Sequence, residues 1–405
     1  MMLVKIAWRN IWRNRRRSLI VILSIVVGVV GLMLNDSFGK GMMNEMLNNQ
    51  IETHYAHMQI YDKQYRNDKV IENRIENPNE ISAILDEQQN VKHFSKRVEV
   101  FGLISSAANS QGVTFVAVEP EKEKKITNVE KTILKGQYLS GKDNEILISQ
   151  ELADQLEIET GDKVVGITNA TDGSVVNELF RVVGIFRTND SNFDKTHIYV
   201  PLKDMQRILE IGDAVTGFAV MLNNKVKIQD KTENINSNLP ENTEAYSYRD
   251  LLPLIVAMIG MYEQSILAFY IIIGIAVLFG IINTMLMSVF ERVQEFGVLM
   301  SLGMKKVKIF RMIMTEALFL GIIGSVIGVV IGLLLFIPLS NSGIDLSLFS
   351  ESMQSFGLGS VIYPEMDVTI LIYSLFTMPV ATMIGAIYPA FKAVRLQPTD
   401  AMRYV

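Results

Sequence analysis

Two histidines placed three residues apart are the first candidates for chemistry in this 405-residue chain. His54 and His57 supply half of a possible metal site, since imidazole nitrogens bind transition-metal ions. The other half is missing, because the chain has only 4 histidines, no cysteine and no second cluster of such ligands. A surface or packing role therefore competes with metal binding, and we predict no metal site.

A second candidate is Glu316, an ionisable residue at the beginning of a long apolar segment. Carboxylates in such positions commonly have a function, because a charge inside a membrane is costly. The alternative is a structural carboxylate that extends towards the membrane surface and pairs with Arg311 or Lys308. Both interpretations remain open.

Motifs for nucleotide binding and for nucleophilic catalysis are missing from the sequence. It has no G-x-x-x-x-G-K-[ST] phosphate loop and no G-x-S-x-G nucleophile motif. Because cysteine is absent, thiol nucleophiles and disulfides are excluded as well. An enzyme is therefore the least favoured class, and we predict no catalytic residue and no cofactor in this chain.

The composition indicates a membrane protein that carries a large polar domain. Hydrophobic residues make up 49% of the chain and charged residues 20%, with a mean hydropathy of +0.24. The formal net charge of −5 is unevenly distributed, because residues 35–264 are acidic and both flanks are basic. This distribution argues against nucleic-acid binding.

The first apolar segment, Leu19–Leu34, follows a basic stretch that also contains Trp8 and Trp12. A cleavable signal peptide has similar flanks, but no small-x-small cleavage site follows here. We therefore predict an uncleaved membrane helix that continues past Gly39 towards Gln50. Lysine and arginine also flank the later apolar segments on one side only, which places both chain ends in the cytoplasm and the acidic domain outside.

These observations predict an integral membrane protein with four transmembrane α-helices and a large α+β domain between the first and second helices. Listed in order, the predicted segments are a cytoplasmic amphipathic N-terminal helix (1–18), the first membrane helix (19–39), stalk helices with the outer domain (40–264), the second membrane helix (265–290), a cytoplasmic helix (291–311), the third membrane helix (312–338), an outer loop (339–367), the fourth membrane helix (368–390) and a cytoplasmic tail (391–405).

β-rich runs separated by polar breaks and short helical runs predict the mixed fold of the outer domain. The predicted strands are His57–Tyr61, Val98–Ser105, Val113–Glu119, Glu145–Ser149, Lys163–Thr168, Val175–Phe186, His197–Val200 and Thr216–Leu222, and the predicted helices are Gln150–Leu156, Pro201–Ile208 and Tyr248–Glu263.

The segment between the second and third membrane helices has the pattern of an amphipathic helix. Val293, Phe296 and Met300 recur at spacings of three and four, and charged residues take the other side. Gly303 followed by lysines is typical of a helix C-terminus. Such a helix can dock into a groove on a soluble partner, and the alternative is an ordinary charged loop.

Glycines recur on the third membrane helix at spacings of three or four residues. In lipid, such small residues let neighbouring helices approach closely, so we predict that this face packs against other helices. The predicted packing residues are Gly321, Gly324, Gly328 and Gly332.

Several segments together resemble the FtsX-like permease family of ABC transporters. The core of that family is similar to N-T-M-L-M-S-V-F-E-R-V-Q-E-F-G-V-L-M-S-L-G-M (Asn283–Met304) and to Thr315–Gly328, and its terminal signatures are similar to Ala7–Ser18 and Tyr388–Arg403. In the outer domain, Gly161–Val164 and Ile198–Gln206 resemble the periplasmic domain shared by macrolide-exporter-like (MacB-type) and lipoprotein-releasing permeases.

The resemblance implies a permease subunit that works with a second permease, either the same chain or a paralogue, and with a dimer of a separate ATPase that holds ATP and Mg²⁺. It implies mechanotransmission, in which ATP-driven closure on the cytoplasmic side moves the outer domain. In the family, the segment matching Glu291–Met304 couples to the ATPase. The residues carried over to that role are Glu291, Arg292, Val293, Glu295, Phe296, Gly297, Met300 and Gly303. Phe296 departs from the family, which usually has a smaller aliphatic residue there.

Within the family, the resemblance favours lipoprotein release from a bacterial inner membrane, with transfer to a periplasmic carrier and contact with membrane lipids. Export of a small molecule or peptide with an outer-membrane partner is an alternative. A second alternative is a non-transporting protein that signals to a cell-wall hydrolase.

Overall fold

The computed structural model describes residues 2–13 and 15–395, with side chains from Lys5 onward. The chain divides into two compact units. The membrane unit consists of Met1–Met43, Met258–Asp345 and Val361–Val405, and the extramembrane domain consists of Asn44–Ala257 and Leu346–Ser360. The part of the predicted cytoplasmic tail beyond Arg395 lies outside the described residues.

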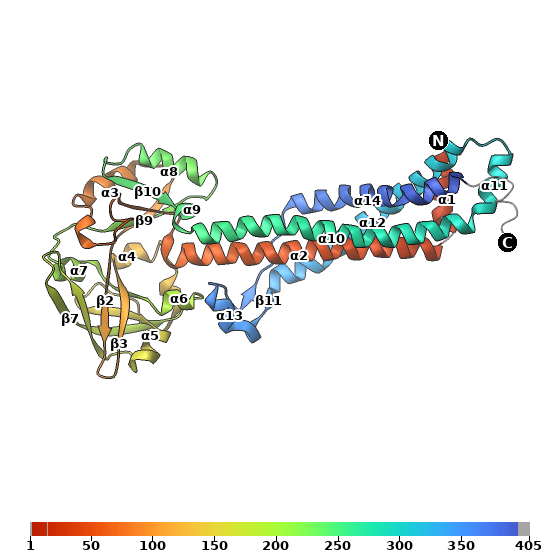
Figure 1. Cartoon of the computed structure of the whole chain (residues 1–405). Coiled ribbons are helices and arrows are strands. Elements are labelled where there is room, and N and C mark those ends of the chain that lie inside the picture. Colours follow the sequence, from red (N-terminus) through yellow and green to blue (C-terminus); the bar gives the residue numbers. More distant parts are fainter. Residues whose placement is uncertain (1, 14, 396–405) are drawn as a thin grey trace. The chain divides into compact units, whose positions relative to one another are not determined.

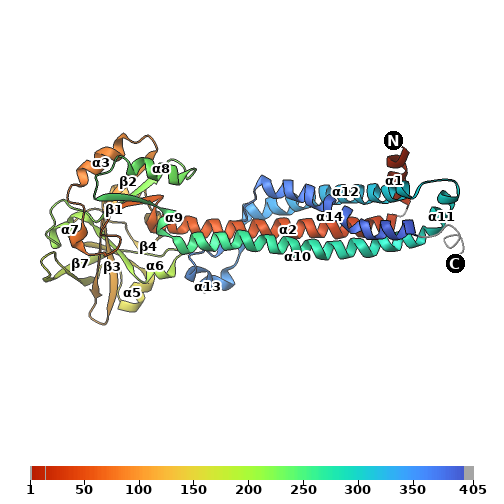
Figure 2. The same cartoon turned by 45° about the horizontal axis from the view of Figure 1, so that its top comes forward.

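Long helices make up the membrane unit, and α2, α10, α12 and α14 run side by side in both Figure 1 and Figure 2. These segments contain long apolar stretches. In lipid, such stretches form helices because a helix satisfies the backbone N–H and C=O groups within the segment itself. The helices that contribute to this unit are α1 (Met2–Arg13), α2 (Arg15–Gln50), α10 (Pro253–Glu291), α11 (Val293–Ser301), α12 (Lys306–Ser342) and α14 (Val368–Arg395). A short antiparallel pair, β11 (Ile344–Asp345) and β12 (Val361–Ile362), completes it.

Four helical stretches in the described part of the chain are long and apolar enough to cross a membrane. They are Arg15–Tyr55, Pro253–Glu291, Lys306–Ser342 and Val368–Arg395. The chain is thus a membrane protein with a large extramembrane α/β domain. Helix α2 does continue to Gln50, as the sequence predicts, whereas the predicted helix Tyr248–Glu263 is divided at Leu252 into α9 (Tyr248–Leu251) and α10.

The glycines of α12 lie where that helix packs most closely against its neighbours. Gly321 faces Thr382 and Pro379 of α14, and the other three glycines face α2. A Cβ atom added at any of them would lie 2.9 Å or less from an atom of the facing helix. The pairs on α2 are Gly324 with Ile25, Gly328 with Val29 and Gly332 with Met33.

One large mixed sheet forms the centre of the extramembrane domain. Its strand order is β10-β1-β9-β2-β3-β8-β5-β7-β4, with β6 paired to β2 and β7. The strands are β1 (Met58–Asp62), β2 (Val91–Ser105), β3 (Ser110–Val118), β4 (Ile133–Gly136), β5 (Glu145–Ser149), β6 (Lys163–Asn169), β7 (Val175–Phe186), β8 (His197–Pro201), β9 (Gly217–Leu222) and β10 (Thr243–Ser247).

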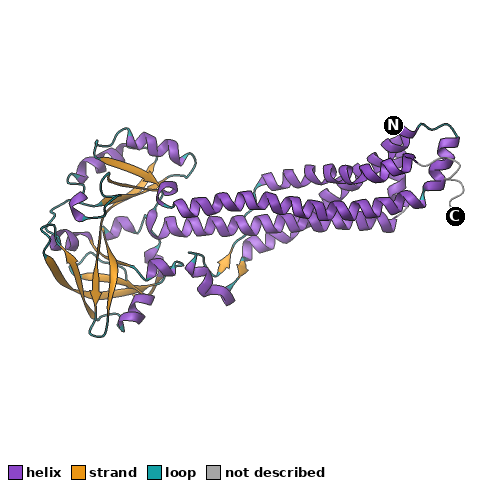
Figure 3. Cartoon of the chain, in the orientation of Figure 1, coloured by secondary structure: helices purple, strands orange, loops and turns teal. Residues whose placement is uncertain are grey.

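The strands gather in two groups within this domain, as Figure 3 shows, and β2 belongs to both. The first half of β2 pairs with β9, and its second half pairs with β3 and β6. Short helices cover the sheet: α3 (Pro78–Glu87), α4 (Pro120–Glu123), α5 (Gln150–Leu156), α6 (Ser191–Asp194), α7 (Leu202–Ile208) and α8 (Ile228–Asn236).

Local signals explain why several predicted elements have the predicted bounds. Strands β5 and β7 and helix α5 coincide with the prediction. Ser149 ends β5 and caps α5, because its hydroxyl accepts a hydrogen bond from the Leu152 N–H at 3.1 Å. Gly173 turns the chain between β6 and β7 with a φ of +81°, a conformation that favours glycine.

The segment after β11 is a folded part of the extramembrane domain rather than a plain outer loop. It contains helix α13 (Ser350–Ser355) and belongs to the same unit as the sheet. The Asn49 side-chain amide donates to the Gly357 carbonyl at 3.0 Å, and the Asn192 side-chain amide donates to the Ser355 carbonyl at 3.1 Å. These bonds attach residues 346–360 to the end of α2 and to α6.

Candidate functional site

Helix α11 connects α10 to α12 and carries most of the residues singled out by the sequence. It begins after Arg292, which interrupts the helical backbone, and its last residue is Ser301, with Leu302 and Gly303 following it. The Gly303 φ of +88° lies in the left-handed region, and the N–H of Met304 closes the helix end by donating to the Leu299 carbonyl at 2.9 Å. Gly303 is therefore a glycine C-cap, as its sequence context predicts.

The apolar face of α11 is covered by the chain itself. Val293 and Phe296 are each only 1% exposed, and Gly297 is buried beside them. Phe296 belongs to the same hydrophobic core as Ile309 and Met312 of α12, and Met300 packs against that core. Val293 and Phe296 therefore do not present an exposed apolar face to a soluble partner, because they already fill a space within the membrane unit, and Met300 is partly buried there.

Arg292 is buried as well, although the amphipathic pattern predicts it on the exposed side. Its Nη1 donates to Glu316 Oε2 at 3.0 Å and its Nε donates to Glu295 Oε2 at 3.3 Å. The guanidinium also lies 5.2 Å from the centre of the Phe296 ring. Arg292 thereby links α10, α11 and α12 through one side chain.

Glu316 is buried with an exposed fraction of 6% and is paired with Arg292. The expectation of a carboxylate that extends to the surface towards Arg311 or Lys308 is therefore wrong. Those two side chains are exposed, and the partner comes instead from the end of α10, 24 residues earlier. The pairing with Arg292 compensates the charge of Glu316, since a buried carboxylate without a cation would be costly.

Helix α1 and the beginning of α2 are each tied to the same region by one ion pair. Arg13 pairs with Glu295, and Arg17 pairs with Glu291. The Trp8 ring packs edge-on against Phe319 of α12, with ring centres 5.8 Å apart. Any force on α11 can therefore pass to α1 and α2 as well as to α12.

The exposed face of α11 has the spacing of a docking surface. Its residues recur at intervals of three and four, as one side of a helix requires. Val298 and Leu302 provide exposed apolar surface on it, with exposed fractions of 49% and 79%. We call this set the α11 outer face; its residues are Glu291, Gln294, Glu295, Val298, Ser301 and Leu302. Val298, Leu302, Arg13 and Arg17 were not predicted as site residues, although the spacing of Val298 and Leu302 on this face is visible in the sequence.

The histidine pair lies in the extramembrane domain, and its two side chains have different surroundings. His57 Nδ1 accepts a hydrogen bond from the Leu222 N–H at 2.9 Å, and burial lowers the pKa of His57 to about 4. His54 is buried next to Glu99. Among the described residues, no three His, Asp or Glu side chains are grouped so that they could hold a metal ion.

Two known protein families match this chain. Residues 18–237 match the MacB-like periplasmic core domain, and residues 267–398 match the FtsX-like permease C-terminal family. The chain is an ABC transporter permease of the FtsX/MacB type. The α11 region therefore lies within the matched FtsX-like segment, and the extramembrane domain contains most of the MacB-like segment.

Relatives of this FtsX/MacB-type permease include lipoprotein-releasing system transmembrane proteins. LolC of Xylella fastidiosa is 26% identical over 71% of this chain and 72% of its own length. LolE of Haemophilus influenzae is 21% identical over 98% of both chains. The macrolide export ATP-binding/permease protein MacB of Psychrobacter arcticus is 22% identical over 96% of this chain and 57% of its own length.

Proposed function

We propose that this permease extracts lipid-anchored proteins from the outer leaflet of a bacterial inner membrane and passes them to a periplasmic carrier. The observation that carries the proposal is an apolar cavity of about 560 Å³ in the membrane unit. Residues of α10 and α14 form most of its lining, and Leu32 of α2 also lines it. The names of the LolC and LolE relatives point to the same substrate class.

The chemistry of this cavity suits acyl chains. Ile266, Leu267 and Ile271 line it from α10, and Tyr373 and Met378 line it from α14. Each methylene group moved out of water contributes about 0.8 kcal/mol, so an acyl chain is a good ligand for such a surface. Glu263 is the one charged residue at the cavity, and it can contact the polar part of a lipid-anchored substrate.

In this proposal the acidic extramembrane domain is periplasmic, and α11 and both chain ends are cytoplasmic. The basic residues before α2 and around α11 support this orientation by the positive-inside rule. A dimer of ATPase subunits, which holds ATP and Mg²⁺, docks on the α11 outer face of this permease and of a second one. Closure of the ATPases then moves α11, and Arg292 carries that movement to α10 and α12.

Site-specific photocrosslinking tests the substrate. A photoreactive amino acid at Tyr373, inside the cavity, should trap a lipid-modified protein in cells. The same amino acid at Val330, an exposed position on α12 that does not line the cavity, should trap phospholipid at most. Adducts with a small molecule or unmodified peptide at Tyr373 would favour an exporter, and the absence of any substrate adduct would favour signalling to a cell-wall hydrolase.

The α11 outer face gives a separate prediction about the ATPase. Leu302→Asp and Val298→Asp should each reduce ATPase pull-down and coupled ATP hydrolysis by about ten- to a hundredfold. Burying one such side chain contributes about 1.5–3 kcal/mol, and a carboxylate there would be desolvated without a partner. The purified permease should remain folded, because both side chains are exposed.

Two comparisons make this prediction specific. Leu348→Asp changes an equally apolar, 95% exposed leucine in the extramembrane domain and should leave ATPase binding unchanged. Phe296→Asp should instead reduce the amount of folded permease, because Phe296 is a core residue. Full ATPase binding by Leu302→Asp would show that the docking surface lies elsewhere.

A further inference from the structure

The extramembrane domain contains a polar cavity that the permease mechanism does not use. Its volume is about 370 Å³, and it opens where the two groups of strands meet along β2. Its lining comes from β1, β2, β3, β8, the helical turn Ile51–Tyr55 before β1, and the segments after β1 and β10. The cavity is lined in part by charged groups and in part by aromatic rings, which is unusual for a simple packing defect.

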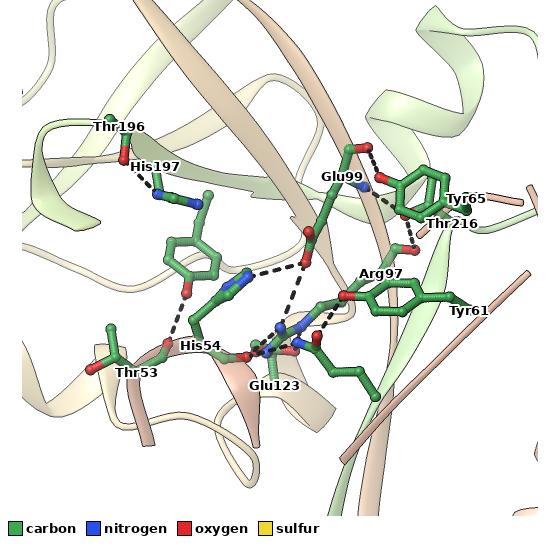
Figure 4. Close-up of polar contacts among 12 residues, drawn as sticks. Thr53, His54, Tyr61, Tyr65, Arg97, Glu99, Glu123, Thr196, His197 and Thr216 are labelled. Atoms are coloured by element: carbon green, nitrogen blue, oxygen red, sulfur yellow. Dashed lines mark hydrogen bonds and ion pairs between the residues drawn. The ribbon is translucent and has the colours of Figure 1, made fainter. Parts of the chain in front are cut away.

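Figure 4 shows the polar contacts around Glu99, a buried carboxylate that lines this cavity. Arg97, which is 2% exposed, is fully engaged with other partners: its Nη2 donates to Glu123 Oε1 at 2.5 Å, its Nε to Glu123 Oε2 at 3.3 Å, and its Nη1 to the His54 carbonyl at 2.6 Å. Glu99 Oε1 lies 3.8 Å from Arg97 Nη1, which is too long for a hydrogen bond. Two buried carboxylates therefore share one guanidinium.

Two polar atoms of the residues that line the cavity are buried without a hydrogen-bond partner. They are Glu99 Oε1 and His54 Nδ1, on side chains that are 5% and 6% exposed. Such orphaned atoms are rare in folded proteins and call for an explanation. His54 Nε2 lies 3.4 Å from Glu99 Oε1, but burial lowers the pKa of His54, so at neutral pH the imidazole adds no positive charge beside Glu99.

Aromatic rings complete the environment of Glu99. Tyr55, Tyr61, Tyr65 and Phe101 all line the cavity. Carboxylates combined with aromatic rings are typical of sites for organic cations, because the ring faces carry negative electrostatic potential. Arg66 and Lys69 also line the cavity. The Arg66 guanidinium donates to the Asp250 carbonyl at 3.0 Å and lies over the Tyr246 ring.

We propose that this cavity binds an organic cation, either a primary ammonium or a guanidinium group, with Glu99 and His54 Nδ1 as the acceptors. The same chemistry is presented by a small amine and by a lysine or arginine side chain of a polypeptide. Burial raises the pKa of Glu99 although the guanidinium of Arg97 opposes this, and a bound cation would favour the carboxylate further. The proposal is independent of the substrate in the membrane cavity.

Binding measurements on the full chain in lipid nanodiscs test the site. The small-molecule arm compares cadaverine, a diamine, with pentan-1-ol, which lacks the charge. The polypeptide arm compares a blocked tripeptide containing lysine with the same tripeptide containing norleucine. Cadaverine or the lysine peptide should bind, and the uncharged member of each pair should not; the arm that binds more tightly identifies the source of the cation.

Two substitutions in the cavity should change the affinity for the cation in opposite directions. Glu99→Gln keeps the shape but removes the charge, so it should weaken cation binding at least about tenfold. Lys69→Gln should strengthen binding severalfold, because Lys69 lines the cavity with a like charge. Glu87→Gln, an exposed position away from the cavity, should have no effect. The proposal is overturned if neither cation binds, or if Glu99→Gln and Lys69→Gln both leave binding unchanged.

Discussion

Arg292→Ala should destabilise the membrane unit by about 3–5 kcal/mol, because it leaves the buried carboxylate of Glu316 without its cation. The side chain also spans three helices and covers the Phe296 ring, so its loss opens a gap in the core next to α11. The measurement is thermal unfolding of the purified permease in detergent, together with the fraction that elutes as a monodisperse species.

Matched variants separate the buried pair from surface electrostatics. The double variant Arg292→Leu with Glu316→Leu should recover most of the lost stability, since apolar residues can replace a buried ion pair at little cost. Arg13→Ala removes an ion pair whose side chains are about half exposed, and it should change stability by less than about 1 kcal/mol. If the single Arg292→Ala variant were as stable as the double variant, Glu316 would not depend on Arg292.

Gly328→Leu should prevent α12 from packing against α2. A Cβ at this position would lie 2.8 Å from the Val29 Cβ and 3.3 Å from the backbone Cα of Val26, so the helices would have to separate. Overpacking of a closely fitted contact costs about 1–3 kcal/mol, and leucine adds three carbon atoms beyond the Cβ. We expect a large loss of folded permease, measured as membrane yield and as size-exclusion profile.

A second glycine in the same bundle provides the control. Gly31 of α2 has no other atom within 4 Å of the position where its Cβ would be, so Gly31→Leu should be tolerated. Gly328→Ala should fall between wild type and Gly328→Leu, since only the first carbon is added. Equal yields of Gly328→Leu and Gly31→Leu would contradict the close contact between α12 and α2.

Much of the fold could be predicted because its signals are local. Strand β7 follows an Asp-Gly turn, and α5 follows a capping serine, so both have the bounds that the sequence indicates. Strand β10 was missed because Thr243–Ser247 has no strong hydrophobic alternation; it forms a strand by pairing with β1, which lies far earlier in the chain. Helices α3 and α8 were missed as well.

The α11 region shows why the candidate site was only partly predictable. Periodicity identifies an apolar face, but it does not say which surface covers that face. Here the core of the membrane unit covers Phe296, and the exposed side carries Val298 and Leu302. Arg292 was misplaced for a similar reason. A charged residue is expected at the surface unless it has a buried partner, and the partner of Arg292, Glu316, comes from a different helix.

The attachment of residues 346–360 to the extramembrane domain has a consequence for the order in which the chain matures. The ribosome completes residues 44–257 first, and the last piece of the same domain follows only after residues 258–345 have been made. Until then Asn49 and Asn192 lack the carbonyls of Gly357 and Ser355. The domain therefore reaches its final form only after α12 has been synthesised, so that biosynthesis links completion of the domain to completion of the third long helix.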